Sequence, residues 1–329
     1  MSDRLLVAGE LGSRHGAAAV LVSDPANLHW LGRPGTAGET LLLCSGAVRS
    51  INGKGPGIEQ TLAELGINRG ALLAADTVPV PGPPGYLTFD LSADLAAARM
   101  RKDAGELAAI TAAAALASAG QEAVRASTVA GAGEEELWQS AWAAIAATAG
   151  RNRPGAAPEI DLLCDLLAGE RTAAIDGPPG ATRLAAGDPL LFDLAPRLAG
   201  YWADSCATFA VGTPSARLRS RHDSVRAALE AGIAAARPGV AAGAVDAAVR
   251  DRLAADGLRC PHHSGHGVGL CAQEPPFLTP GESTPLEEGM TIAIETGAYG
   301  EGFGVRLEHL VVIEADGARP LTTHSLTLT

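Results

Sequence analysis

Two apolar segments in the second half of the chain carry acidic residues where a folded core disfavours them. Asp193 follows the apolar residues 190–192, and Glu295 follows residues 291–294, 102 positions after Asp193. Burying an unpaired carboxylate is so costly that the group takes up a proton or binds a cation. The repeated pattern predicts an internally duplicated domain with a cation site. The alternative is two unrelated hairpins.

The first segment has the pattern of a hairpin with two acids on facing strands. Centring its turn between Leu198 and Ala199 places Asp193 directly opposite Asp204. Opposed residues of an antiparallel pair have Cβ atoms roughly 4.5–5.5 Å apart, and like charges there destabilise the sheet. A compensating group is therefore expected. The pairing assumes a regular hairpin, because one bulge would move it by a residue.

The second segment repeats the arrangement around a glycine-rich turn. Centring that turn between Glu301 and Gly302 places Glu295 opposite Glu308. Both acids lie in strongly apolar strands, so both face the same cost of burial. Two such hairpins, stacked in one sheet, predict four converging carboxylates.

A histidine-bearing loop lies between the two hairpins. Residues 261–269 carry His266 among glycines that permit close approach of the backbone. Alone, His266 has the pattern of a hydrogen-bonded loop residue, but beside four carboxylates it is a candidate ligand. This donor set suits Mn, Fe, Co or Zn as a bridged pair better than a structural zinc site. The predicted metal ligands are Asp193, Asp204, His266, Glu295 and Glu308.

Composition excludes several classes of protein. The 329-residue chain has a net charge of -12, 47% hydrophobic and 19% charged residues, which excludes a nucleic-acid binder working by bulk charge and a disordered chain. Its five cysteines show no C-x-x-C spacing, so neither a disulfide framework nor a thiolate zinc site is predicted. No signal peptide and no uncharged apolar stretch of about 18 residues is visible. We therefore expect a cytoplasmic protein with no membrane or nucleic-acid partner.

The first hundred residues differ in character from the rest. A proline- and glycine-rich stretch at residues 79–85 marks the approach to a boundary, and Ser92 is a candidate N-cap for an alanine-rich helical segment reaching Ile110. We expect two domains, residues 1–98 and 99–329. In the first, an α/β pattern predicts strands at residues 17–22, 27–31, 40–43 and 70–75 and a helix at residues 57–65.

These motifs together resemble the pita-bread metallopeptidase family, which includes methionine aminopeptidase, Xaa-Pro aminopeptidase, prolidase and the non-peptidase creatinase. Besides the five ligands, the resemblance rests on GHGVG at residues 265–269 and RKDAGE at residues 101–106. It implies an α+β pita-bread catalytic domain with internal pseudo-twofold duplication. A small α/β domain of the creatinase type, short for that type, is implied before it.

The resemblance also implies a mechanism. Two divalent metal ions, Mn first and Co, Fe or Zn otherwise, would activate a bridging water that attacks a small peptide or peptide-like amide. Glu295 would be the proton shuttle. One ion would be held by Asp204, His266, Glu295 and Glu308, and the other by Asp193, Asp204 and Glu308.

Three further expectations concern the surroundings of the ions. Arg306, two residues before Glu308, is expected to orient the carboxylates rather than touch substrate. His262 and His263 are expected to line the approach to the metals. A homodimer is implied by the resemblance only.

Two positions depart from the family pattern. Asp176 and Gln273 stand where the family's peptidases carry substrate-facing histidines. A carboxylate there pairs with an ammonium or guanidinium group, unlike a histidine, and the alternative for Asp176 is a solvated loop acid.

Three functions therefore compete. The first is a metallopeptidase of the Xaa-Pro aminopeptidase or dipeptidase type. The second is a creatinase-like hydrolase or lyase acting on a small, cationic metabolite, suggested by Asp176 and Gln273. The third is a metal-stabilised binding protein without chemistry, against which the retained Glu295 argues.

Overall fold

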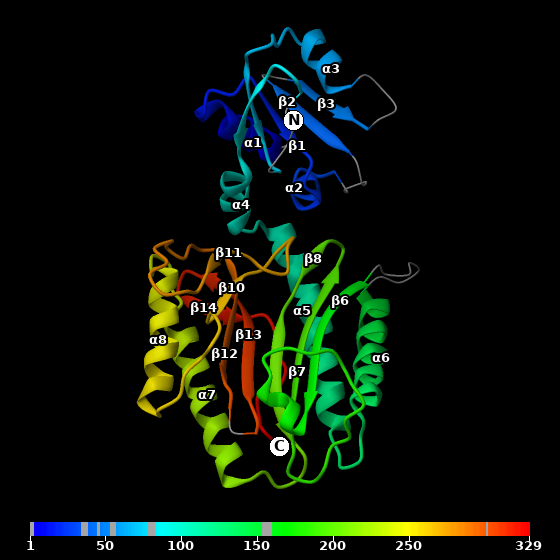
Figure 1. Ribbon diagram of the computed structural model, residues 1–329, viewed down its shortest axis with the longest axis vertical. Coiled ribbons are helices and arrows are strands. Elements are labelled where there is room, and N and C mark those ends of the chain that lie inside the picture. The colour runs from blue at the N-terminus through cyan, green and yellow to red at the C-terminus, as the bar shows by residue number, and fades with distance from the viewer. Residues whose placement is uncertain are drawn as a thin grey trace. The chain divides into compact units, whose positions relative to one another are not determined.

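The computed structural model describes residues 3–33, 39–44, 47–52, 57–77, 83–152, 160–300 and 302–329. The chain divides into two compact units, Met1–Arg99 and Met100–Thr329, each with its own sheet (Figure 1). The boundary expected between residues 98 and 99 lies one residue from this division. Residues 79–82 of the proline- and glycine-rich stretch, and Glu301 in the second turn, lie outside the described residues.

The first unit contains a five-stranded mixed sheet with the order β3-β2-β1-β4-β5. Strand β1 pairs antiparallel with β2 and parallel with β4. Leu21, Leu42, Leu62 and Leu73 form part of its buried core. The strands are β1 (Ala19–Val22), β2 (Thr40–Cys44), β3 (Ala47–Ile51), β4 (Leu72–Ala75) and β5 (Leu87–Asp90), and the helices are α1 (Asp3–Arg14), α2 (Pro25–Trp30), α3 (Ile58–Glu64) and α4 (Ser92–Met100).

The strand predicted at residues 27–31 is wrong, because helix α2 occupies this segment. Asp24 caps the helix by accepting a hydrogen bond from the backbone N–H of Asn27 at 3.0 Å. Pro25 follows in the first turn, where its missing N–H costs nothing. A short apolar run fits either element by periodicity, and here the Asp-Pro start signal decides for the helix.

The second unit contains a nine-stranded sheet. Seven strands follow the order β11-β10-β12-β13-β9-β7-β6, while β14 pairs with β13 and β8 pairs with β7. The strands are β6 (Ile160–Ala168), β7 (Pro189–Leu198), β8 (Tyr201–Trp202), β9 (Ser205–Ala210), β10 (Gly265–Gly267), β11 (Glu274–Phe277), β12 (Thr291–Ala298), β13 (Val305–Glu314) and β14 (Gly317–Pro320).

This sheet has two similar halves, each preceded in the chain by a pair of helices (Figure 1). Helix α5 (Ala104–Ser127) contacts β7 and β9 and packs beside α6 (Glu134–Asn152). Helix α7 (Ala216–Ala235) contacts β12 and β13 and packs beside α8 (Ala242–Ala255). Strands β9 and β13 pair with each other, so they join the two hairpins at the centre of the sheet.

Helices α5 and α7, which lie against the sheet and are called the inner helices below, each carry a glycine that brings the helix close to the strands. A Cβ atom on Gly120 of α5 would lie 2.6 Å from Leu194 Cδ2, and one on Gly232 of α7 would lie 3.1 Å from Ile294 Cγ2. Leu194 and Ile294 therefore face the helices. Because successive strand residues point to opposite faces, their neighbours Asp193 and Glu295 project from the face away from α5 and α7.

The helical segment expected from Ser92 onward forms two helices, α4 and α5. Helix α5 begins with a capping box in which Asp103 and Glu106 exchange side chain to backbone hydrogen bonds of 2.9 Å. In the described chain it is the one helix long and apolar enough to cross a membrane, yet 50% of that stretch is buried inside the protein. Its Gln121 donates to the carbonyl oxygens of Phe192 and Ser205, as expected of a core helix.

Candidate metal centre

Five neighbouring strands place one residue each in a single row across the sheet. Asp165 of β6 pairs with Asp193 of β7, and Asp193 pairs with Cys206 of β9. Cys206 pairs with Glu308 of β13, which in turn pairs with Glu295 of β12. Directly opposed residues share a face of the sheet. Four carboxylates and one thiol therefore line the face away from the inner helices.

The predicted register of the first hairpin is wrong, because Asp193 lies opposite Cys206 and not Asp204. The turn consists of Ala199 and Gly200, with φ of 52° and 89°. Positive φ at both central residues is typical of a two-residue type I′ turn. This turn centres the hairpin one residue later than predicted. The pairing consequently shifts by two residues, an even number that keeps Asp204 on the face of Asp193.

The predicted register of the second hairpin is confirmed, because Glu295 lies directly opposite Glu308. Glu308 is 1% exposed, and its Oε1 has no hydrogen-bond partner among the described residues. A buried acceptor without a donor loses hydration and regains nothing. This oxygen therefore fits a ligand of a cation.

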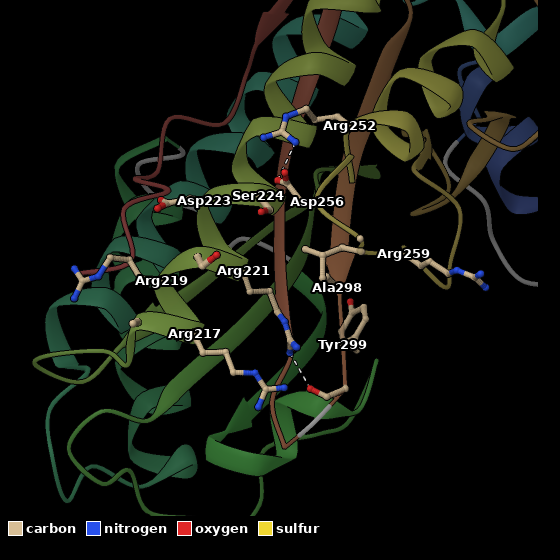
Figure 2. A pocket seen from close by; sticks show the side chains of 15 residues that line it. Arg217, Arg219, Arg221, Asp223, Ser224, Arg252, Asp256, Arg259, Ala298 and Tyr299 are labelled. Atoms are coloured by element: carbon tan, nitrogen blue, oxygen red, sulfur yellow. Dashed lines mark hydrogen bonds and ion pairs between the residues drawn. The ribbon is translucent and has the colours of Figure 1, made fainter. Parts of the chain in front are cut away.

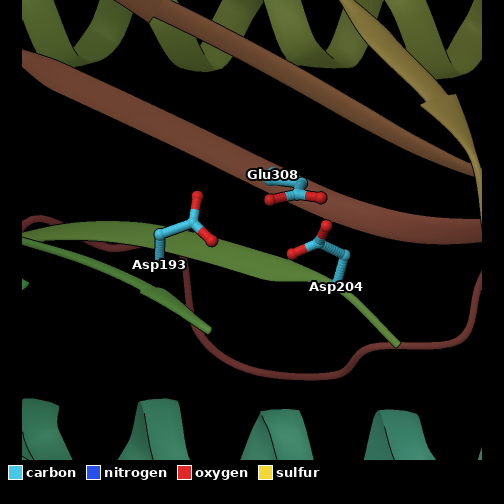
Figure 3. Close-up of side chains that lie close together, drawn as sticks. All are labelled: Asp193, Asp204 and Glu308. Atoms are coloured by element: carbon cyan, nitrogen blue, oxygen red, sulfur yellow. The ribbon is translucent and has the colours of Figure 1, made fainter. Parts of the chain in front are cut away.

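Asp193, Asp204 and Glu308 form a group in which one oxygen atom of each residue lies within 4.8 Å of the others (Figure 3). Burial raises the pKa of Asp193 to about 6, although the Arg306 charge opposes this. Burial and the neighbouring carboxylates raise the pKa of Asp204 and of Glu308 well above the usual range. The group favours protons or a cation, and its hard oxygen donors fit a divalent metal ion.

His266 presents one ring nitrogen toward this group. Its Nδ1 lies 3.0 Å from the carbonyl oxygen of Gly267, which can only accept, so Nδ1 carries the hydrogen. The lone pair is then on Nε2, which lies 3.6 Å from Asp204 Oδ2. Burial lowers the pKa of His266 and favours the neutral imidazole that binds metals.

Glu295 turns toward two histidines. Its Oε1 lies 3.2 Å from His263 Nδ1, and its Oε2 lies 3.8 Å from His262 Nδ1. Burial by itself would raise the pKa of Glu295, but the contact with His263 and the charges of His262 and Arg306 outweigh it and lower the pKa to about 2. Glu295 is therefore held as a carboxylate beside the three-carboxylate group.

Arg306 contacts two acids, Asp193 of the first hairpin and Asp165 of β6. Its Nη2 lies 2.9 Å from Asp193 Oδ2 and 3.6 Å from Asp165 Oδ2, and its Nη1 donates to the carbonyl oxygen of Ile175 at 2.9 Å. Asp165 was not predicted from the sequence. The feature that could have revealed it is an acid inside the apolar segment 160–168, which pairs with the strand of Asp193.

A cavity of about 550 Å³ opens over this face of the sheet. Asp176 and Gln273 are exposed at its wall, whereas the ion-binding candidates lie deeper. All ten residues predicted from the sequence line it: Asp176, Asp193, Asp204, His262, His263, His266, Gln273, Glu295, Arg306 and Glu308.

A larger hollow of about 1060 Å³ elsewhere in the second unit has five arginines among its 15 lining residues. Figure 2 shows their guanidinium groups pointing in different directions. Arg221 donates to the carbonyl oxygen of Gly300 at 2.8 Å, and Arg252 pairs with Asp256 at 2.8 Å. Arg217 and Arg221 both lie over the ring of Phe303. The group of described residues that could hold a metal ion lines the smaller, acid-lined cavity, which is therefore the candidate centre.

The profile of metallopeptidase family M24 matches residues 108–315. The chain belongs to this family. The M24 match spans both hairpins and the histidine-bearing loop. The prolidase of Pyrococcus horikoshii OT3 has the same fold, with a TM-score of 0.86 over 100% of both chains at 22% identity. The predicted α+β pita-bread fold is thereby confirmed.

Two further relatives of this M24 chain are named dipeptidases. The structure of dipeptidase PepE from Mycobacterium ulcerans is similar with a TM-score of 0.84 and 27% identity, over 99% of this chain and 96% of that one. The Xaa-Pro dipeptidase of Lactobacillus helveticus is 41% identical over 136 residues, which are 40% of this chain and 37% of that protein. The matched segments span about a third to a half of the curated relatives' own lengths.

Proposed function

We propose that this chain is a metallohydrolase of the peptidase type, cleaving a small peptide or peptide-like amide as an Xaa-Pro aminopeptidase or dipeptidase would. One observation carries the proposal: oxygens of Asp193, Asp204 and Glu308 converge within 4.8 Å, and the buried Glu308 Oε1 lacks a partner among the described residues. Membership of family M24 and the relatives named prolidase and Xaa-Pro dipeptidase support it.

The donor set fits two divalent ions, Mn first and Co, Fe or Zn otherwise. When bound, such a pair supplies Lewis-acid polarisation of the scissile carbonyl and activates a water for attack. Asp204 and Glu308 would be shared between the ions. Asp193 would complete one site, and His266 and Glu295 the other.

The chain's own residues would handle the proton. Glu295 would take the proton of the attacking water and pass it to the leaving nitrogen, as a general base and then a general acid. His262 and His263 keep the Glu295 carboxylate charged and oriented. Arg306 holds Asp193, and the Gly267 carbonyl holds the ring of His266.

We extend the proposal to the organisation of the protein. Residues 1–98 would form a creatinase-type N-terminal domain, and residues 99–329 the metal-binding catalytic domain. A homodimer in the cytoplasm is the expected working form. Size-exclusion chromatography with light scattering would test the assembly.

A second candidate function is a creatinase-like hydrolase or lyase for a small, cationic metabolite. It is favoured by Asp176 and Gln273, which line the cavity where the family's peptidases carry histidines. Neither side chain supplies the imidazole that would contact a peptide carbonyl. An assay of one enzyme preparation on peptides and on guanidino compounds separates the two functions.

The test of the first candidate begins with metal-free protein loaded with Mn²⁺. We expect two ions per chain by elemental analysis, and hydrolysis of Xaa-Pro di- and tripeptides that depends on them. Asp204→Asn should lose both, whereas Asp251→Asn, an exposed acid on α8, should lose neither. Two bound ions without hydrolysis of any peptide, or an Asp204→Asn variant with unchanged metal binding, would overturn the proposal.

A further inference from the structure

The backbone on both sides of Asp176 is held in place by the metal centre's own charged residues. The carbonyl oxygen of Ile175 accepts a hydrogen bond from Arg306 Nη1 at 2.9 Å. The N–H of Gly177 donates to Asp165 Oδ1 at 2.9 Å. Arg306 is 5% exposed, so the first of these bonds comes from a buried, fixed group. Asp176 is thus positioned at the cavity wall while its side chain stays exposed.

Apart from bound metal ions, the wall of this cavity offers no unengaged arginine or lysine among its described residues to an anionic substrate group. Of the described residues that line it, Arg306 is the only arginine or lysine, and it is engaged by Asp193, Asp165 and the Ile175 carbonyl. A free substrate carboxylate would therefore find no available guanidinium or ammonium group on the wall. Asp176, in contrast, is a carboxylate outside the three-carboxylate group that faces the cavity.

The wall around Asp176 is partly apolar. Leu163 is 54% exposed and Ile175 is 39% exposed, and both line the same cavity. Two exposed apolar side chains at the edge of a cavity give the apolar part of a ligand a surface to pack against. A methylene chain that ends in a cation matches such a wall, because its stem packs on apolar side chains while its head reaches a carboxylate.

We propose that Asp176 is a specificity residue that binds an ammonium or guanidinium group at the end of a substrate's alkyl chain. The substrates would be amides that carry such a cation and need no free carboxylate. The inference rests on the proposed function for the hydrolytic step. Asp165 would act as a positioning residue, since it reaches Asp176 only through the backbone of Gly177.

The test compares two chromogenic amides of nearly the same shape, arginine p-nitroanilide and citrulline p-nitroanilide, on the full-length Mn²⁺-loaded protein. We expect the kcat/KM of the arginine compound to be higher by at least about tenfold, as for a hydrogen bond to a charged group. Asp176→Asn should bring this ratio close to one with unchanged metal content. The matched control Asp251→Asn should keep the ratio of the unaltered protein.

Asp165→Asn tests the positioning role. It should lower the arginine-to-citrulline ratio part of the way, with a larger change in KM than in kcat for the arginine compound, because Asp176 would be present but less well held. A ratio equal to that of the unaltered protein would show that Asp165 does not position Asp176.

The failure of the inference is distinguishable from that of the proposed function. Turnover of both amides at equal kcat/KM would overturn the role of Asp176 and leave the hydrolase intact. If neither amide is turned over, calorimetry with arginine amide and citrulline amide replaces the assay. Tighter binding of arginine amide that Asp176→Asn abolishes would support the inference, and equal binding would overturn it.

Discussion

The two hairpins of the metal centre deliver their acids by different geometry. In the second, a turn between Ala298 and Val305 leaves Glu295 directly opposite Glu308. In the first, a two-residue turn places Asp193 opposite Cys206, and Asp204 lies two residues before Cys206, nearer the turn. Oxygens from both hairpins still meet within 4.8 Å. Convergence of carboxylates therefore requires a common face, and direct opposition is one of two ways to reach it.

The hairpins also differ in how their negative charge is balanced. Asp193 has Arg306 at 2.9 Å, and Glu295 has His263 at 3.2 Å. Glu308 has an oxygen without a partner among the described residues. The acids thus range from one already paired within the protein to one that depends on a bound cation.

Removing the unpaired acid should have the largest effect. Glu308→Gln should abolish metal-dependent hydrolysis, because Glu308 is, with Asp204, one of the two residues expected to bind both ions, and an amide is a poor bridging ligand. Metal content and peptide hydrolysis are the measurements. Glu288→Gln, at an exposed glutamate outside the cavity, is the matched control. Full activity of Glu308→Gln would show that the centre does not need the Glu308 carboxylate.

Removing Arg306, the cation that balances Asp193, should mainly lower the stability of the folded protein. Arg306→Ala leaves Asp193 without its partner, and breaking a buried ion pair this way costs about 3–5 kcal/mol. Arg252→Ala, which breaks an exposed pair with Asp256, should cost under about 1 kcal/mol. Urea unfolding of the metal-free proteins compares them. Equal losses would mean that Arg306 does not balance Asp193.

The stabilisation by metal should increase with pH between about 4 and 7. The pKa of Asp193 is raised to about 6 in the folded protein, so its contribution to stability is present at low pH and is lost as pH rises through 6. A bound cation removes this loss, worth about 3 kcal/mol for Asp193.

Unfolding at pH 5 and pH 7, with and without Mn²⁺, measures the increment, which is the free energy of unfolding gained on adding the metal. Buried histidines such as His222, whose pKa burial lowers to about 4, give the opposite slope in both forms and cancel in the difference. An increment that is constant or falls with pH would contradict the raised pKa of the acids.

The smallest expected effects concern the turns themselves. Ala199 has a φ of 52°, so Ala199→Gly should stabilise the protein by about 1 kcal/mol through relief of left-handed strain. Gly302 has a φ of 89°, so Gly302→Ala should destabilise the protein by introducing the same left-handed strain. Thermal unfolding of both variants gives the two signs. Changes in stability of the same sign for both variants would mean that strain at positive φ does not control the stability of these turns.

Much of the centre could be predicted because its signals are local. The acids stand out against apolar neighbours, and all five predicted ligands line one cavity. Asp165 escaped notice because its strand pairs with β7 across an intervening 3-10 helix and loop. The strand predicted at residues 27–31 is wrong because its three apolar residues, Leu28, Trp30 and Leu31, fit a helix turn as well as a strand.

The sequence by itself determined which side of the sheet each acid occupies and that the buried acids need a proton or a cation, because side-chain alternation along a strand and the cost of burying charge are local properties. Tertiary structure decided the rest. The backbone of Ala199 and Gly200 set the register of the first hairpin, and the pairing of β9 with β13 brought Glu308 beside Cys206. Those choices depend on turn conformation and on contacts between residues about a hundred positions apart, which no local pattern encodes.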